Sequence, residues 1–209
     1  MRYPKIFSLF LAAIAFAAAG AWAQGYQKLE NPQPTDGSGK IEVIEFFWYG
    51  CPHCYAMEPT VAAWLKTKPA DVEFKRVPAY AGSWVPLASV YYTLEAMGKL
   101  DAMHTKVFDA IHRDHANLQN KTVLQKFLKD NGIDPAEYEK VEKSFSVVSK
   151  LGRDKDLTIR YQVDSVPRFF VAGKYVTSGD IAGGNDKIMP AIDQAIAAVR
   201  KESGGKAAK

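Results

Sequence analysis

The stretch Phe46-Phe47-Trp48-Tyr49-Gly50-Cys51-Pro52-His53-Cys54-Tyr55 contains the only two cysteines of this 209-residue chain. Two residues separate the thiols, so a disulfide between them would close a very small ring. The stability that a disulfide gives grows with the number of residues it encloses, and this bridge would add little. The spacing therefore indicates a pair of thiols that react, because a structural cross-link gains least here.

The residues around the cysteines predict a strand followed by a helix. Residues 41–48 are almost continuously apolar, which is typical of a buried strand, and residues 72–77 predict a second one. Glu45 falls on the buried face of the first strand, where its carboxylate would be partly desolvated. Cys51 is placed to cap a helix whose first turn holds Pro52, a position where a missing N–H costs little.

This placement predicts two thiols of different reactivity. Cys51 would face the unpaired N–H groups and the positive dipole end of the helix, and both favour a thiolate. Cys54, one turn further on, would be shielded, and His53 between them can donate to or polarise the neighbouring sulfur. A stabilised thiolate makes the reduced form more stable, so the disulfide form accepts electrons readily. The motif therefore favours a donor of disulfides over a reductase.

The first 23 residues predict a secretory signal peptide. Arg2 and Lys5 precede an apolar run over residues 6–19, and Ala21-Trp22-Ala23 is a small-residue cleavage site. We expect cleavage after about Ala23 and an exported, soluble mature protein. Removal of the leader lowers the formal net charge from +4 to +2. With no cluster of basic residues and interleaved aromatics, the sequence gives no indication of nucleic-acid binding.

The rest of the chain predicts one domain over residues 24–209. Apolar residues recur every three to four positions over about 85–161, which predicts an all-helical insertion. It interrupts an α/β core at about 40–84 and 162–200, which ends in a hairpin and a last helix over about 185–200. Residues 201–209 predict a flexible tail.

One helix of the insertion has a strong start signal. Asp134 is the expected N-cap, followed by Pro135 in the first turn and Glu137 in the third position. Its apolar face is predicted to continue along the chain through four residues: Tyr138, Val141, Phe145 and Val148.

Beyond these patterns, the sequence resembles the periplasmic thiol:disulfide interchange proteins of the DsbA type, in the thioredoxin superfamily. Three features carry the resemblance over nearly all of the mature chain. Cys51-Pro52-His53-Cys54 matches the usual active-site tetrapeptide, the helical insertion lies at the family's position, and Ser165-Val166-Pro167 matches the family's cis-proline loop. The resemblance implies a thioredoxin-like α/β fold, a mixed central sheet flanked by helices, with an all-helical insertion.

The resemblance also implies roles for several residues. The Val166–Pro167 bond should be cis and lie beside the cysteines, and Val166 backbone groups should pair with an extended substrate. Glu45 matches a buried acid that assists proton movement near the shielded sulfur, and Lys75 is a possible partner for it.

The same resemblance implies partners and a compartment. The substrates should be reduced, unfolded exported proteins in the periplasm. A quinone-linked inner-membrane reoxidase of the DsbB type should restore the disulfide, and the protein should be a monomer. The redox-active disulfide needs no added cofactor and no metal.

Alternative functions remain open at this point. An isomerase or reductase would use the same chemistry, but isomerases carry an N-terminal dimerisation domain, and only residues 24–40 precede the first strand here. Isomerases also tend to have Thr before the cis-proline, where this chain has Val166. A metal-binding or holdase module is a different class. It would need more ligands than the two thiols and His53. His104, His112 and His115 are predicted to be solvated surface residues.

Overall fold

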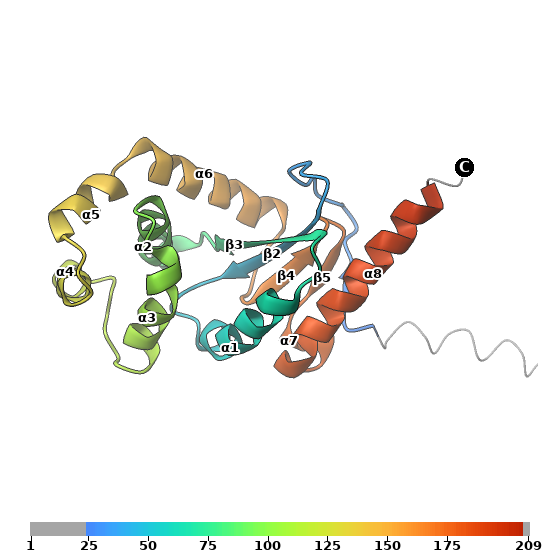
Figure 1. Ribbon diagram of the computed structural model, residues 1–209, viewed down its shortest axis with the longest axis horizontal. Helices are drawn as coiled ribbons and strands as arrows, with labels where there is room; N and C mark the ends of the chain where they lie inside the picture. Colours follow the sequence, from blue (N-terminus) through green and yellow to red (C-terminus); the bar gives the residue numbers. More distant parts are fainter. Residues whose placement is uncertain (1–23, 207–209) are drawn as a thin grey trace, which may run out of the picture.

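The structure is a computed structural model that describes residues 24–206, so the predicted signal peptide lies outside the described residues. Five strands form one sheet in the order β1-β5-β4-β2-β3 (Figure 1). β2 runs parallel to β3, and the other neighbouring pairs are antiparallel. The strands are β1 (Gln27–Lys28), β2 (Ile41–Phe47), β3 (Val72–Pro78), β4 (Arg168–Val171) and β5 (Tyr175–Thr177).

Helices surround this mixed sheet, as the predicted fold class requires. The α-helices are α1 (Pro52–Thr67), α2 (Val85–Ala96), α3 (Leu100–His112), α4 (Lys121–Asp130), α5 (Pro135–Glu142), α6 (Phe145–Arg160), α7 (Gly179–Ala182) and α8 (Ile188–Lys206). Two short 3₁₀ turns, η1 (Gly82–Trp84) and η2 (Asn185–Lys187), precede α2 and α8. Among the described helices, none combines the length and the apolar character needed to cross a membrane.

β2 lies inside the sheet and has apolar cover on both faces. Side chains alternate along a strand, so Val43 faces one layer while Ile44 and Phe46 face the other. On the Val43 side, the cluster includes residues of α1 and α8. On the Ile44 side, the end of α6 contributes Tyr161, whose ring packs 5.6 Å from that of Phe46. This double cover explains the continuous apolar run that predicted the strand.

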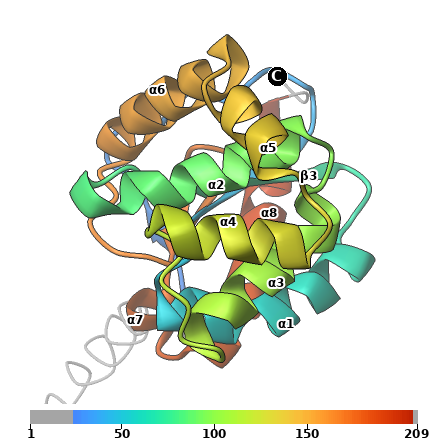
Figure 2. The ribbon, with the colours of Figure 1, turned by 90° about the vertical axis from the view of Figure 1, so that its left-hand side faces the viewer.

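The helices α2 to α6 lie together at one end of the sheet, and α4 lies in front of the others in Figure 2. Their apolar side chains form a core around Leu94, Val107 and Phe108. The same cluster contains Phe47 and Tyr49 at the end of β2 and both cysteines. The insertion therefore packs directly against the segment that carries the thiols.

The sequence predicted one helix that starts at Pro135 and carries Val148 on its apolar face. The second half of this prediction is wrong. Asp134 caps α5 as expected, since its side chain accepts from the Ala136 N–H at 3.1 Å. However, α5 ends at Glu142, and Ser144 adopts an extended conformation and caps α6. The new helix turns the apolar face away, and Phe145 and Val148 are 86% and 57% exposed. A local capping residue thus overrides the apolar periodicity.

The prediction of a flexible tail from residue 201 onward is wrong up to Lys206, because α8 continues through this residue. Glu202 accepts hydrogen bonds from Lys174 Nζ at 2.7 Å and from the Tyr175 hydroxyl at 2.5 Å. These contacts anchor the last turns of α8 to the β4–β5 hairpin. The polar composition that suggested a tail therefore belongs to the solvent-facing end of a helix.

Asp154 in α6 is a buried acid with weak compensation, since Arg153 Nε lies 4.0 Å from its Oδ1. Its side chain is 0% exposed, and neither carboxylate oxygen has a hydrogen-bond partner among the described residues. Burial raises the pKa of Asp154 to about 7 from an ordinary 3.8, although the Tyr92 hydroxyl and Arg153 oppose the shift. A raised folded-state pKa favours folding at acid pH. This contribution is lost as the pH rises through about 7.

We therefore expect Asp154→Asn to stabilise the protein by about 1–3 kcal/mol at about pH 8, where the native carboxylate is charged and buried. The gain should vanish near pH 4. Urea unfolding at both pH values measures the difference, and Asp156→Asn, at an exposed position of the same helix, is the matched control. A gain that does not depend on pH would contradict this assignment.

Candidate active site

The cysteines lie where β2 passes into α1 through a tight turn. The Cys51 N–H donates to the Trp48 carbonyl at 2.9 Å, which closes the turn over Tyr49 and Gly50. A side chain at Gly50 would lie 2.4 Å from the Trp48 ring, so only glycine fits there. Cys51 is the N-cap of α1 and Pro52 opens the helix, as predicted. The thiol of Cys51 thus lies at the end of α1 where N–H groups are unpaired.

The two free thiols have different surroundings. Cys51 is 7% exposed and Cys54 is 0% exposed, whereas Pro52 and His53 are exposed. The pKa of Cys51 is lowered to about 6, first by a hydrogen bond from the Cys54 thiol, then by the N–H groups of Cys54 and His53 and the charge of His53. Burial raises the pKa of Cys54, and the neighbouring Cys51 sulfur adds to this.

The direction of these shifts agrees with the prediction, but their largest cause does not come from the helix or from His53. The second thiol is the main hydrogen-bond donor to the first. Because the Cys51 thiolate accepts from the Cys54 thiol, the same contact lowers one pKa and raises the other. The two cysteines therefore divide their roles between them.

The loop before β4 brings a third element to the thiols. The Val166–Pro167 peptide bond is cis, as the resemblance implies. The Cys51 thiol donates to the Val166 carbonyl at 3.3 Å, although the two residues are far apart in sequence. Pro167 is buried and Val166 is half-buried. The main chain of the cis-proline loop thus lies beside the more reactive sulfur.

A buried ionic cluster lies behind the cysteines. Glu45, 0% exposed, accepts from Arg76 Nε at 3.1 Å, and Arg76 Nη2 also donates to Glu58 at 3.1 Å. Burial raises the pKa of Glu45 to about 7, although Arg76 opposes the shift. Burial likewise disfavours the charge of Glu58, but His104 and Arg76 outweigh it and lower its pKa. One guanidinium thus serves two carboxylates, and only Glu45 has a pKa near neutrality.

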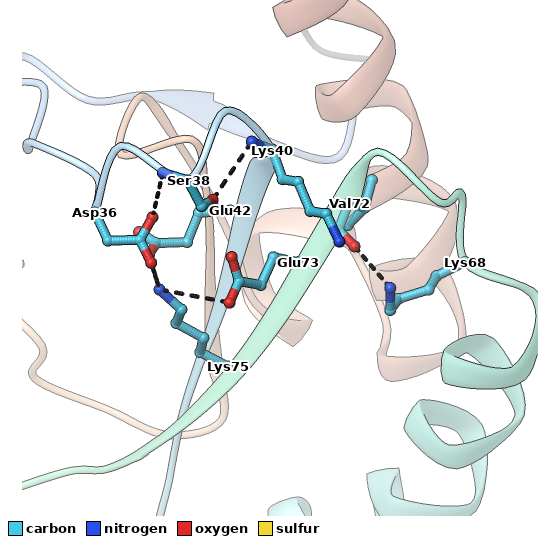
Figure 3. A network of polar contacts seen from close by, with 8 residues as sticks. All are labelled: Asp36, Ser38, Lys40, Glu42, Lys68, Val72, Glu73 and Lys75. Atoms are coloured by element: carbon cyan, nitrogen blue, oxygen red, sulfur yellow. Dashed lines mark hydrogen bonds and ion pairs between the residues drawn. The ribbon is translucent and has the colours of Figure 1, made fainter.

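Lys75, the possible partner named from the sequence, does not contact Glu45. In the β2–β3 register Glu45 lies opposite Arg76, and Ile44 lies opposite Lys75. Paired residues share a face of the sheet, so Lys75 projects to the opposite face. There Lys75 contacts Asp36 and Glu42, with Glu73 4.0 Å away (Figure 3). Arg76, and not Lys75, is the cation that pairs with Glu45.

The prediction that three histidines lie on the surface is wrong for two of them. His104 is 7% exposed, with Nδ1 2.7 Å from the Tyr49 hydroxyl and Nε2 3.3 Å from Glu58. His112 is half-buried, and its Nε2 lies 2.8 Å from the Tyr49 carbonyl. His115 is exposed, as predicted. Both His104 and His112 lie on α3, and the apolar stripe of this helix gives no indication of their polar contacts.

The sequence held weak signals for the missed residues. Glu58 follows Cys54 by one helical turn, a spacing that places both on one face of α1. Arg76 follows the same strand alternation that revealed Glu45. Neither signal was sufficient, because an acid on a helix and a base on a strand usually face solvent. Among residues 24–206, the structure contains no group of three His, Cys, Asp or Glu side chains that could hold a metal ion.

A thioredoxin-like sheet with two thiols at the start of its first long helix and a cis-proline beside them defines a thiol:disulfide oxidoreductase. Comparison with known proteins agrees. Residues 68–196 match the family model of the DSBA-like thioredoxin domain, a stretch that begins after the cysteines and so is independent of their motif. The chain is 40% identical over 172 residues to the thiol:disulfide interchange protein DsbA of Pseudomonas aeruginosa, and the match covers 82% of each chain.

The DsbA of Bordetella parapertussis is 42% identical over 197 residues, which cover 91% of this chain and 93% of the relative. The crystal structure of Pseudomonas aeruginosa DsbA superimposes with a TM-score of 0.80 at 39% identity, over 86% of this chain and 94% of that one. The chain belongs to the DsbA family of thioredoxin-like thiol:disulfide oxidoreductases. The resemblance found in the sequence is thereby confirmed.

Proposed function

We propose that this protein is a periplasmic disulfide oxidase that donates its Cys51–Cys54 disulfide to reduced, newly exported proteins. The observation that carries this proposal is the asymmetry of the two thiols. The pKa of Cys51 is lowered to about 6, whereas burial raises that of Cys54. A stabilised Cys51 thiolate lowers the free energy of the reduced form, so the disulfide form is a strong acceptor of electrons.

The reaction proceeds by two exchanges. A substrate thiolate attacks Cys51 Sγ, the bond between Cys51 and Cys54 breaks, and a mixed disulfide forms at Cys51. Cys54 leaves as a thiolate and takes up a proton. A second substrate thiolate then attacks the substrate sulfur of the mixed disulfide and releases the Cys51 thiolate, a good leaving group because of its low pKa. The substrate loses two electrons and two protons, and the cysteine pair gains the electrons.

Glu45 is the proposed proton donor and acceptor for Cys54. Its carboxyl group is buried, its pKa is raised to about 7, and Oε1 has no hydrogen-bond partner among the described residues. A group that titrates near neutral pH can hold the proton in one step and release it in the next. We assign Pro52 the start of α1, and we assign His53 the role of a neighbour that donates to or polarises the Cys51 sulfur.

The substrate backbone is proposed to pair with Val166 at the edge of the cis-proline loop. The contact of 3.3 Å between the Cys51 thiol and the Val166 carbonyl supports this proposal, because a group bonded to this sulfur would begin next to the loop. Pro167 has no N–H to donate, so Val166 supplies the polar main-chain groups. An extended chain bound there would place its own cysteine next to Cys51.

The partners follow from the chemistry. Each turnover leaves a reduced Cys51–Cys54 pair, so a second protein must remove two electrons. We assign this step to a quinone-linked inner-membrane reoxidase of the DsbB type, and we assign the protein a monomeric state and a periplasmic location. The relatives are named as thiol:disulfide interchange proteins, which supports the exchange with reduced substrate proteins.

The thiolate titration of the reduced protein tests the proposal. The far-ultraviolet absorbance of Cys51 should rise with a midpoint at about pH 6, with Cys51→Ser as the blank. In equilibrium with glutathione, the reduced protein should be favoured over its disulfide. A midpoint near the ordinary value of ~8.5, with the disulfide form more stable than glutathione disulfide, would contradict an oxidase.

A further inference from the structure

Tyr49 lies two residues before Cys51, and helix α3 of the insertion holds it at two points. The residue is 1% exposed, and its ring packs against Phe47 and Phe108. In Figure 2, α3 lies beside α1, the helix that begins at the cysteines. Apolar packing alone would bury this ring. The polar contacts at both ends of the residue need a separate explanation.

The first contact holds the side chain. The Tyr49 hydroxyl lies 2.7 Å from His104 Nδ1, and His104 Nε2 lies 3.3 Å from Glu58 Oε1. Burial lowers the pKa of His104, and a neutral imidazole carries one ring proton. The Glu58 carboxylate lies close to Nε2 without a well-aligned hydrogen bond, and its negative charge favours the ring proton on Nε2. Nδ1 then accepts from the Tyr49 hydroxyl.

The second contact holds the main chain. His112 Nε2 lies 2.8 Å from the Tyr49 carbonyl oxygen, which can only accept, so His112 donates. The His112 ring stacks on Tyr55 of α1 at 4.9 Å between centroids and 10° between planes. The Tyr55 hydroxyl in turn donates to Asp109 of α3 at 2.8 Å. α3 therefore fixes both the turn before Cys51 and the first turn of the helix after it.

We propose that His112 and His104 are positioning residues, through which the helical insertion holds the Tyr49–Gly50 peptide and keeps Cys51 at the N-terminus of α1. Tyr49 and Gly50 are the central residues of the turn that the Cys51 N–H closes onto Trp48. If that peptide rotates, Cys51 Sγ moves relative to the N–H groups of His53 and Cys54, which favour its thiolate. The inference rests on the proposed function of Cys51.

His112→Phe provides the test, because phenylalanine keeps the stacking on Tyr55 and removes the donor. We expect the Cys51 thiolate midpoint to rise by about half a pKa unit, and the equilibrium constant with glutathione to move about threefold toward the disulfide form. His112→Gln, which offers an amide N–H in a similar place, should restore the native midpoint. His115→Gln, an exposed change just beyond the same helix, is the control and should leave the midpoint unchanged.

Tyr49→Phe is a second, independent arm that removes only the hydroxyl, and it should raise the midpoint in the same direction by a smaller amount. Far-ultraviolet circular dichroism of each variant confirms that the fold is retained. A native midpoint in both His112→Phe and Tyr49→Phe would overturn the inference while leaving the oxidase proposal intact. A rise in His112→Gln equal to that in His112→Phe would also overturn it, because the lost donor would not be the cause.

Discussion

Cys51→Ser is expected to reduce the catalysed oxidation of a reduced, unfolded substrate to the rate measured without the protein. Oxygen cannot replace sulfur in the exchange, so neither the disulfide nor the mixed disulfide can form. Serine is a favoured N-cap residue, and the variant should therefore keep α1 and the fold. The assay is the regain of activity of a reduced, denatured enzyme that needs its disulfides.

Cys54→Ser is the matched variant, because it keeps Cys51 and removes only the resolving sulfur. A mixed disulfide with substrate or glutathione should accumulate on it, visible as an added mass that a reductant removes. Restoration of substrate disulfides by the Cys51→Ser protein would exclude the exchange mechanism at this site. Accumulation of the adduct on Cys54, with Cys51 replaced, would reverse the assignment of the two sulfurs.

Arg76→Met carries the second large expected effect, on stability. The guanidinium is the cation that contacts both Glu45 and Glu58 in the buried cluster. Its removal leaves two buried carboxylates without their cation, and the expected loss in the free energy of unfolding is about 3–5 kcal/mol. Arg76→Lys keeps the charge but cannot reproduce both contacts of the planar guanidinium, so its loss should be smaller.

The pH dependence identifies the cause of that loss. Without Arg76, burial raises the folded-state pKa of Glu45 further above the unfolded value, and only His104 still opposes the effect of burial on Glu58. A raised pKa favours folding at acid pH and loses this contribution as the pH rises through it. The Arg76→Met defect should therefore be small at about pH 4, near the unfolded glutamate pKa, and full at about pH 8. Urea unfolding at both values measures it, and an equal loss at both would point to packing rather than to charge.

Sequence patterns predicted the active-site segment well because its causes are local. The apolar run of β2 follows from burial on both faces, and Cys51 and Pro52 lie at the start of α1 because turn and capping chemistry depend on adjacent residues. The burial of Glu45 followed from strand alternation alone. These features involve residues within a few positions of each other, and the chain carries that information directly.

The errors concern partners that come from other elements. Lys75 and Arg76 are neighbours in sequence, and the face on which each lies depends on the register between β2 and β3. The sequence predicted His104 at the surface, but the packing of α3 places it against Tyr49. The break at Ser144 separated Phe145 and Val148 from the apolar face, because the cap of a new helix outweighed a continuous periodicity.

The sequence by itself determined that two thiols lie at the start of a helix and that the chain has an α/β core with a helical insertion. Helix starts, strand alternation and loop size are all fixed by short stretches of chain. The family resemblance, and not the residues alone, implied that Val166 lies beside Cys51. Only the tertiary structure decided that Arg76 and not Lys75 contacts Glu45, and that α3 holds Tyr49. Each of these contacts joins residues whose distance depends on how whole elements pack.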